Sequence, residues 1–239
     1  NAKPIDLPGS AFSVRWSPTG KQLAISIAPK PLVDDRFTAQ NIHIYSLESE
    51  QIETLTTAGK LGTFRWSPDG DHIGAIVSDD KNDPHAGILE IFKKEIPEPI
   101  TRIQHQEGHI RTFAWQSPSK LMYLLDEGVW SSLREENIDV SEKKVLIQAG
   151  GPVMSNLSLS NNGQSAAFVG HSPSHPREVF SMRYGEFNPQ KLTDHNQWLS
   201  EVRLAPQEVV RHLARDDIEL EGVLIRPLNE VQRTRYPLV

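Results

Sequence analysis

Residues 62–70 read Gly-Thr-Phe-Arg-Trp-Ser-Pro-Asp-Gly, and residues 12–20 read Phe-Ser-Val-Arg-Trp-Ser-Pro-Thr-Gly. A third copy, with one extra residue before the proline, is Arg-Thr-Phe-Ala-Trp-Gln-Ser-Pro at 111–118. A degenerate fourth copy is Asn-Leu-Ser-Leu-Ser-Asn-Asn-Gly at 156–163. The tryptophans of the first three copies are 50 and 49 residues apart, and Leu159 follows 44 residues later. Self-similarity at such a period indicates a repeat architecture.

Each copy predicts a β-strand followed by a tight turn. In the first copy Val14 and Trp16 alternate with Ser13 and Arg15, which is the period-2 pattern of a strand with two distinct faces. Ser-Pro-x-Gly suits a type I turn, because proline presets φ and glycine favours the exit. Further apolar segments predict a second strand near 23–27, 73–77 and 166–168, a third at 42–47, 88–93, 129–133 and 179–183, and a fourth ending near 56, 103, 147 and 193.

Four strands in a unit of 44 to 50 residues predict the blade of a β-propeller. The expected fold class is all-β: a partial propeller of about four four-stranded antiparallel blades within residues 3–200, with repeats near 9–56, 60–104, 108–149 and 153–196. A single repeat cannot bury its own apolar face, so we expect Trp16, Trp66 and Trp115 to pack between blades. An arc cut from a larger ring is favoured over a closed ring of four, and its open blade edges predict self-association.

The composition describes a globular protein and excludes several classes. Hydrophobic residues make up 37% and charged residues 23% of the 239 residues, and the net charge is −6. Without a basic block, or an apolar run near the ~20 residues that span a bilayer, we expect neither nucleic acid nor a membrane as a partner. The absence of cysteine excludes disulfides and thiolate chemistry.

We interpret Asn1-Ala2 as a cloning remnant. The compartment stays open between bacterial cytoplasm and periplasm, with the periplasm slightly favoured.

The pattern changes after residue 196. Residues 207–227 predict two strands around the turn Asp216-Asp217, which is a hairpin. The chain then reaches the apolar residues Tyr236-Pro237-Leu238-Val239, where we expect another strand to start.

These features together resemble the prolyl oligopeptidase family of serine peptidases, and more narrowly its bacterial acylaminoacyl-peptidase and dipeptidyl-aminopeptidase branch. The resemblance lies in the repeats with Trp66-Ser67-Pro68-Asp69-Gly70, the hairpin and residues 236–239. Further matching segments are 31–35, 82–87, 126–129, 150–153, 214–217 and 221–222. The resemblance covers essentially the whole chain. It is most specific after residue 200, because the blade repeat before that point is shared with the Tol-system periplasmic propeller.

The resemblance implies a propeller that lies as a lid over an α/β-hydrolase domain, which begins within residues 201–239. This chain would then be the non-catalytic, substrate-gating part of a serine peptidase that hydrolyses short peptides, and its partners would be peptide substrate and the hydrolase domain of the same parent chain. The alternative is a non-enzymatic protein-interaction propeller of the Tol-system type.

We expect no catalytic residue and no cofactor in this chain. The family's Gly-x-Ser-x-Gly motif does not occur, and the nearest string, Gly170-His171-Ser172-Pro173-Ser174, lacks the final glycine and falls in a predicted loop. Two histidine pairs, His105 with His109 and His171 with His175, have the spacing of a helical zinc pair. Both fall in loops with Gly or Pro, so no metal site is expected.

The candidate site residues lie on loops between second and third strands, because functional groups concentrate on such loops. The long loops span 28–40 and 79–86, and a shorter one spans 170–176. A carboxylate there would pair with the amino terminus of a peptide, and an arginine with its carboxylate. The candidates for lining the chamber or docking the hydrolase domain are Asp34, Asp35, Arg36, Asp83, His85 and Arg177. The alternative is a set of solvated loops stabilised by turn-forming side chains.

Overall fold

The computed structural model describes residues 3–57, 59–81, 87–106 and 108–237. Most of its regular structure is antiparallel sheet, in four four-stranded sheets whose strands pair in sequence order. The first sheet contains β1 (Ser10–Trp16), β2 (Gln22–Ala28), β3 (Asn41–Ser46) and β4 (Ile52–Leu55). The second contains β5 (Leu61–Trp66), β6 (His72–Val77), β7 (Ile88–Lys93) and β8 (Pro99–Ile103).

The other two large sheets follow the same plan. The third contains β9 (Gly108–Ser117), β10 (Lys120–Glu127), β11 (Trp130–Asn137) and β12 (Lys143–Ile147). The fourth contains β13 (Val153–Leu159), β14 (Ser165–Ser172), β15 (His175–Arg183) and the short β16 (Gln190–Lys191). A separate hairpin consists of β17 (Gln207–Leu213) and β18 (Glu219–Ile225).

Two short helical segments interrupt this pattern. The helix α1 (Val33–Thr38) lies between β2 and β3, and the 3-10 helix η1 (Gln197–Glu201) follows the fourth sheet. The sequence predicted only a loop where α1 forms. The helix has six residues and buries none of them, so it leaves no apolar periodicity that sequence reasoning can detect.

The recurrence of serine and glycine in the motif follows from the first turn of each blade. The Gly20 N–H donates to the Ser17 carbonyl (2.9 Å), and the Ser17 hydroxyl accepts from the Gln22 N–H (3.1 Å). The same pair of bonds forms at Ser67 and at Ser160. The glycines of these three turns have φ between 67° and 77°, which glycine adopts without strain. The degenerate fourth copy therefore keeps the turn although it has lost the tryptophan.

Apolar faces of neighbouring sheets pack together, as the repeat predicted. Between the first and second sheets, the buried Ile42 and Ile44 face Phe64, Trp66 and Ile88. Equivalent clusters join the second sheet to the third, and the third to the fourth. The cores therefore lie between the sheets, so each blade depends on its neighbours for burial.

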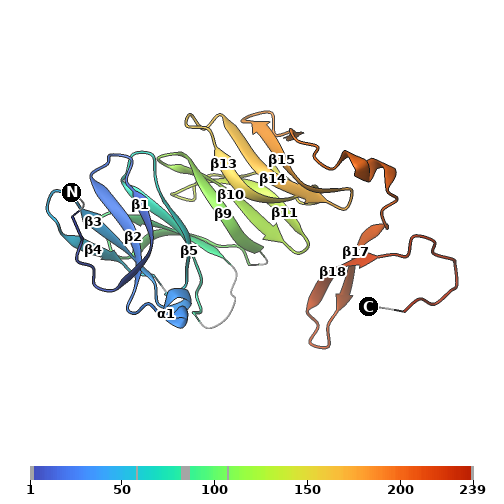
Figure 1. Cartoon of the computed structure of the whole chain (residues 1–239), viewed down its shortest axis with the longest axis horizontal. Coiled ribbons are helices and arrows are strands. Elements are labelled where there is room, and N and C mark those ends of the chain that lie inside the picture. The colour runs from blue at the N-terminus through green and yellow to red at the C-terminus, as the bar shows by residue number, and fades with distance from the viewer. Residues whose placement is uncertain (1–2, 58, 82–86, 107, 238–239) are drawn as a thin grey trace.

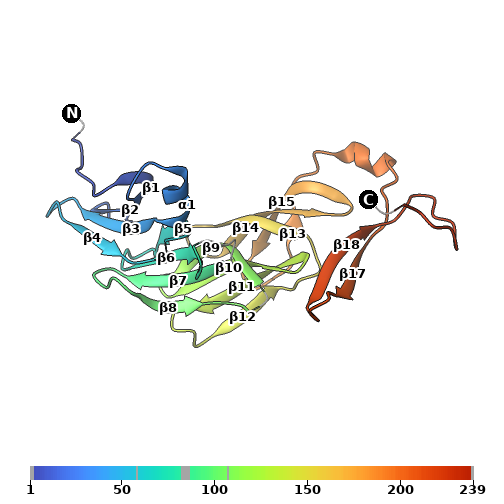
Figure 2. The same ribbon diagram turned by 90° about the horizontal axis from the view of Figure 1, so that it is seen from below.

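The four sheets form an open arc (Figures 1 and 2). In Figure 2 the fourth strands β8 and β12 lie along the lower edge, while the first strands β5, β9 and β13 lie nearer the opposite side. The first strands of neighbouring sheets contact each other, β1 with β5 and β9 with β13. They form the inner wall of the arc, and the all-β partial propeller is confirmed.

Trp16 is the exception to the predicted packing between blades. Trp66 is 8% exposed and Trp115 is partly buried against the cluster of the second and third sheets, but Trp16 is 61% exposed. The prediction is wrong for Trp16 because, among the described residues, no sheet covers the outer face of the first blade. Only Ile5 and Leu7 of the N-terminal segment lie against that face.

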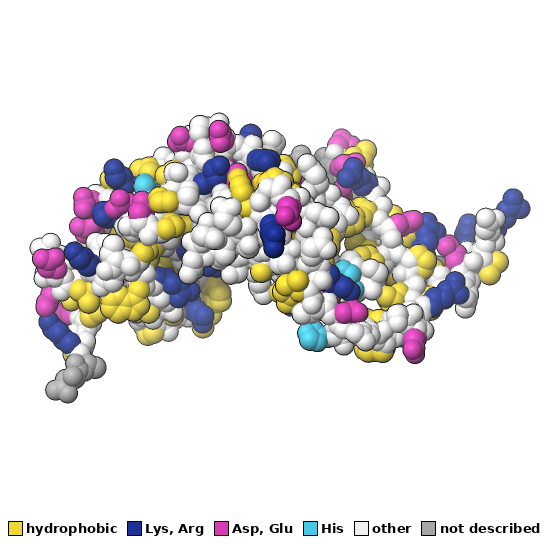
Figure 3. Space-filling view, turned by 90° about the horizontal axis from the view of Figure 1, so that it is seen from above, with side chains coloured by type: hydrophobic (Ala, Val, Ile, Leu, Met, Phe, Trp, Pro, Cys, Tyr) yellow, Lys and Arg dark blue, Asp and Glu magenta, His cyan; other side chains and the backbone are white. Residues whose placement is uncertain are grey.

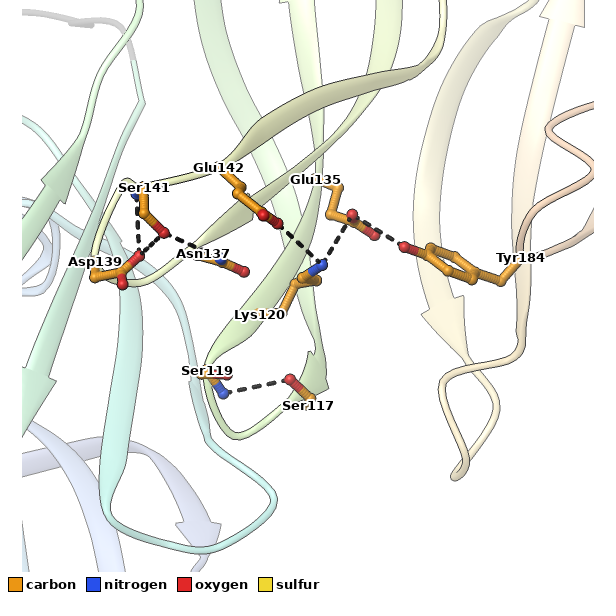
Figure 4. Close-up of polar contacts among 9 residues, drawn as sticks. All are labelled: Ser117, Ser119, Lys120, Glu135, Asn137, Asp139, Ser141, Glu142 and Tyr184. Carbon is orange, nitrogen blue, oxygen red and sulfur yellow. Dashed lines mark hydrogen bonds and ion pairs between the residues drawn. The ribbon is translucent and has the colours of Figure 1, made fainter.

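A polar link joins the third and fourth blades (Figure 4). Glu135 is buried, and its Oε1 accepts from the Tyr184 hydroxyl of the next blade (3.1 Å) and from Lys120 Nζ (3.3 Å). A buried carboxylate needs such partners, because desolvation penalises an unpaired charge. In the same view the backbone N–H of Ser119 donates to the Ser117 hydroxyl (3.4 Å) in the shorter first turn of this blade.

The predicted hairpin forms, with strands that pair from Gln207 with Ile225 to Leu213 with Glu219. The strand expected at residues 236–239 is not seen at Tyr236 and Pro237, which pair with no strand. A β-strand needs a neighbour for its backbone hydrogen bonds. Leu238 and Val239, like Asn1 and Ala2, lie outside the described residues.

Candidate functional site

One rim of the arc carries every connection between a second and a third strand. Their described residues are 29–40 with α1, 78–81 with 87, 128–129 and 173–174. They share a rim because equivalent strands run in the same direction in every blade. Figure 1 shows α1 and the β17–β18 hairpin along the lower side of the molecule. We call this edge the hairpin rim.

Three of the predicted site residues lie together on α1 at the hairpin rim. The guanidinium of Arg36 lies over the rings of Phe12 (5.7 Å) and Phe37 (5.8 Å). Neither Asp34 nor Asp35 forms an ion pair with any described residue. Asp34 is exposed and Asp35 is half-buried, so Asp34 is the more accessible of the two to a partner at this end of the arc.

The other predicted residues are not brought to α1. Arg177 belongs to the fourth blade, at the opposite end of the arc, where it lines an open cavity of about 350 Å³ with Leu199 and Leu204. It therefore faces the segment that leads from the blades to the hairpin. Asp83 and His85 lie outside the described residues. The role of all six residues stays a prediction.

A large cavity lies between the third blade and the hairpin and was not foreseen from the sequence. Its volume is about 1020 Å³. Charged and polar side chains make up about half of its wall. They come from the connection between blades, from β10 and β11, and from both hairpin strands: His105, Gln106, Glu127, Arg134, Arg211, Glu219 and Glu221.

Glu221 connects the hairpin to the third blade. Its Oε2 accepts from the backbone N–H of Val129 (3.3 Å), and its Oε1 accepts from Arg211 Nε (2.7 Å). Gly128 makes this approach feasible, because a Cβ there would lie 1.9 Å from Glu221 Oε2. Gly128 also has φ of 56°, a conformation that favours glycine. The contact joins residues 92 positions apart in sequence.

A buried chain of hydrogen bonds ends at the cavity. The Tyr123 hydroxyl donates to Glu136 Oε2 (2.8 Å) and lies 3.0 Å from His105 Nε2. Because the hydroxyl has one proton, it accepts from His105, which places the imidazole proton on Nε2 and leaves Nδ1 as an acceptor. Burial and the positive charge of Arg134 lower the pKa of His105, and burial and Glu136 raise the pKa of Tyr123. Both side chains are therefore neutral near pH 7.

Glu127 and Arg134 form the second polar group on the blade wall. Arg134 Nη2 donates to Glu127 Oε1 (2.8 Å), and Arg134 Nε donates to the Ser132 hydroxyl (3.1 Å), which itself donates to Glu127. Burial opposes ionisation of Glu127, but the hydrogen bonds from Ser132 and Arg134 outweigh it and lower the pKa of this carboxyl. The cavity thus presents fixed charges of both signs, which suits recognition of a polar chain.

The charged side chains of the cavity can bind and position a polar ligand. In the described part of the chain no serine hydroxyl is hydrogen-bonded to a histidine imidazole. Ser172 ends β14 and Ser174 lies in the tight turn that leads to β15, whereas a nucleophile elbow requires a strand-to-helix turn. His109 Nδ1 accepts from the Gly87 N–H (2.7 Å), whereas His105 is hydrogen-bonded to Tyr123, so the two histidines bind different partners.

The described residues contain no group of three or more His, Asp or Glu that could hold a metal ion. None of the described helices is long and apolar enough to cross a membrane.

Sequence reasoning missed the cavity because no motif or spacing in the sequence links the segments that form its two walls. His105 lies between blades, Glu127 ends a strand, and Glu221 belongs to the hairpin. The resemblance pointed to 126–129 and 221–222 as separate segments. Only the fold places them in contact.

Comparison with known proteins supports the architecture at low sequence identity. No family model matches the sequence, and no curated protein matches it. Among solved structures, a puromycin-hydrolyzing peptidase of Mycobacterium tuberculosis is 15% identical, with a TM-score of 0.70, over 94% of this chain and 35% of that one. A puromycin hydrolase is 16% identical, with a TM-score of 0.69, over 91% of this chain and 34% of that one.

A third similar structure is a TolB protein of Agrobacterium tumefaciens. It is 16% identical, with a TM-score of 0.55, over 79% of this chain and 63% of that one. This chain spans about a third of the length of the two peptidases. At these identities the likeness shows the fold: this chain is a partial β-propeller of a kind found in a puromycin-hydrolyzing peptidase and in TolB.

Proposed function

We propose that this chain is the non-catalytic, substrate-gating propeller portion of a serine peptidase that hydrolyses short peptides, of the acylaminoacyl- or dipeptidyl-peptidase kind. One observation carries the proposal: the likeness to the peptidases extends beyond the blades. The four sheets run from Ser10 to Lys191, which is 182 of 239 residues, or about 76%. A match over 94% leaves out only about 14 residues, so it includes most of the last 48.

The hairpin rim supplies a physical route to gating. Glu221 fixes the hairpin against the third blade, and a cavity of about 1020 Å³ stays open between them. Whatever passes must fit between the third sheet and a hairpin that lines the cavity with both charged and apolar side chains. Short, extended peptides can do so, because their backbone groups and termini find hydrogen-bond partners among Glu127, Arg134 and Glu219. A folded protein is too wide for a space of this size.

The alternative is a non-enzymatic interaction propeller of the Tol-system type. The TolB match supports it, but it covers 79% of this chain, which the four sheets alone nearly account for. An interaction propeller gives no reason for the contact between Glu221 and the third blade. We therefore favour the peptidase.

Expression of the full gene that encodes this chain tests the proposal. Puromycin is a suitable first substrate, because two of the similar structures are puromycin-hydrolysing enzymes; a chromogenic tripeptide and a folded protein complete the set. We expect the full product to cleave both small substrates, to spare the folded protein and to react with a fluorophosphonate. The 239-residue chain alone should do none of these. A full product that neither cleaves nor reacts would favour the interaction propeller.

Self-association through the open faces is part of the same proposal. Val14 is 51% exposed and Trp16 is 61% exposed at one end of the arc, and Leu192 is 61% exposed at the other. Exposed apolar surface of this kind favours association. Sedimentation velocity of this chain over a hundredfold concentration range should show growing species. A monomer at every concentration would contradict this part.

A further inference from the structure

The charges around the cavity beside the hairpin do not balance. Two arginines and three glutamates line it. Arg134 is paired with Glu127, and Arg211 is paired with Glu221. The third glutamate, Glu219, forms no ion pair and no hydrogen bond with a described residue. One negative charge is therefore left without a partner in the cavity.

Glu219 lies on the face of the hairpin that is turned toward the third blade. It is two positions from Glu221 on β18, and side chains two positions apart on a strand point to the same face. Glu221 accepts from the backbone N–H of Val129 in the third blade, so this shared face is the one next to the blade. Figure 2 shows the hairpin beside the third sheet. The carboxylate of Glu219 thus projects into the cavity from the hairpin wall.

His105 offers a second acceptor on the opposite wall. Its Nε2 donates to the Tyr123 hydroxyl (3.0 Å), so its Nδ1 carries a lone pair. Nδ1 has no hydrogen-bond partner in the described part of the chain, and it is not one of the side-chain atoms that are sealed from solvent. The Tyr123 ring, whose centroid lies 5.7 Å away, also contacts the imidazole. A ligand in the cavity therefore meets this lone pair on a ring that is already held in place.

The two groups left without a partner, Glu219 and His105 Nδ1, both accept hydrogen bonds, so the ligand that complements them is a donor. A carboxylate would be repelled by Glu219 and would have to compete with Glu127 and Glu221 for the arginines. An ammonium or guanidinium group satisfies both acceptors, and the indole of Trp130, which also lines the cavity, favours a cation as well. In Figure 3, side chains of both signs are interspersed with apolar ones toward the C-terminal end of the molecule. Selectivity for a cation therefore arises inside the cavity and not from a surface of one sign around it.

We propose that the cavity binds an ammonium or guanidinium group of a peptide between Glu219 and His105 Nδ1, so that positive charge on a peptide decides which peptides the gate admits. Glu219 supplies the charge, and His105 supplies a neutral acceptor that orients the bound N–H. The net charge of −6 also attracts cations to the molecule. The identification of the ligand as a peptide rests on the proposed function.

Three amidated peptides test the site on the 239-residue chain, without catalysis. Alanyl-phenylalanyl-alanine amide has a charged amino terminus, its N-acetyl form has no charge, and N-acetyl-alanyl-phenylalanyl-lysine amide carries the charge on a side chain. In NMR titrations at pH 7 and low salt, we expect at least one cationic peptide to bind about tenfold more tightly than the neutral one. The preference should shrink in 0.5 M salt. The peptide that binds identifies the source of the cation, whereas equal binding of all three would overturn the proposal.

Matched variants assign the preference to Glu219. Glu219→Gln should bring the ratio of the cationic to the neutral affinity close to one, because the shape of the side chain is kept and its charge is lost. Glu53→Gln makes the same change in net charge at an exposed glutamate of β4 that forms no ion pair with a described residue, and it should keep the full preference. If Glu219→Gln retains the preference, the cation binds elsewhere and the proposal is wrong.

A spectroscopic measurement assigns the second acceptor without a variant. With histidine labelled at its ring nitrogens, the NMR resonance of His105 Nδ1 should shift when a cationic peptide is added and should stay in place with the neutral peptide. The exposed His212 should not respond to either. Tight cation binding that leaves His105 Nδ1 unchanged would contradict its role.

Failure of this inference can be told apart from failure of the proposed function. A full gene product without peptidase activity would defeat the proposed function, yet a preference of this chain for cationic peptides would still stand. An active peptidase whose 239-residue portion binds all three peptides equally would defeat only the cation site.

Discussion

Trp16 and Trp66 occupy the same position of the same motif, yet one is 61% exposed and the other 8%. Their strands pair in the same way, and their turns form the same hydrogen bonds. The difference lies in what stands next to them. The first blade packs against Trp66 and accepts its indole N–H, while among the described residues no blade does the same for Trp16. A repeat thus determines the shape of a blade, but burial is decided by the neighbouring blade.

Replacing the two tryptophans is the strongest way to break this comparison. We expect Trp66→Ala to lower the free energy of unfolding by about 3–5 kcal/mol, because it removes a large side chain from a packed interface. Trp16→Ala should cost about 1 kcal/mol or less, since most of its surface is already in water. Urea unfolding of both variants measures the difference. Similar losses would mean that a surface covers Trp16 in solution.

A smaller effect is expected at Gly74, where the second blade meets Phe113 of the third blade. A Cβ at Gly74 would lie 2.7 Å from Cε2 of the Phe113 ring in the third blade, whereas the equivalent position in the first blade holds the buried Ala24. Gly74→Ala should therefore destabilise the protein by about 1–3 kcal/mol through overpacking.

Gly151 serves as the control for that variant. A Cβ there meets nothing within 4 Å, and its φ is not positive, so Gly151→Ala should change stability by less than about 0.5 kcal/mol. Thermal unfolding of the two variants compares them. Equal stabilities would show that the second and third blades are more loosely packed than the structure indicates.

The hairpin differs from the blades, because polar contacts hold it in place whereas apolar cores join the blades. Glu221→Gln should weaken the ion pair with Arg211 and the contact with Val129. We expect the free energy of unfolding to stay within about 0.5 kcal/mol, while amide exchange speeds up at Val129 and along β17 and β18. Glu219→Gln, on the same wall of the cavity, should change neither the free energy of unfolding nor the rate of amide exchange in the hairpin. Unaltered exchange in Glu221→Gln would mean that other contacts hold the hairpin.

The smallest predicted effect is a pH dependence at His105. Its pKa in the folded protein is lowered by burial and by Arg134, so on acidification the unfolded chain takes up a proton before the folded one. Stability should therefore be complete above the unfolded pKa of about 6.5 and should fall as the pH drops toward the folded pKa. His105→Gln should flatten this part of the stability curve, measured by urea unfolding between about pH 7 and pH 5. The exposed His212→Gln should follow the unmodified protein; a parallel decline in His105→Gln would contradict the prediction.

Blades and hairpin could be predicted because their signals are local. Alternation such as that of Val14 and Trp16, together with Ser17 and Gly20 at the turn, specifies a strand and its reversal over a few residues. The short helix α1 escaped prediction because it contributes no buried residue. The cavity escaped because His105, Glu127 and Glu221 are far apart in the sequence and each occurs in an ordinary polar setting.

The sequence by itself determined the unit of this protein: its four strands, its turns and the faces that must be covered, since these depend on side-chain alternation and turn chemistry within some fifty residues. Only the tertiary structure decided which of those faces are covered and where Glu221 meets Val129. Burial and electrostatics depend on distances in space, and residues 50 or 92 positions apart acquire those distances only when the blades stack and the hairpin docks.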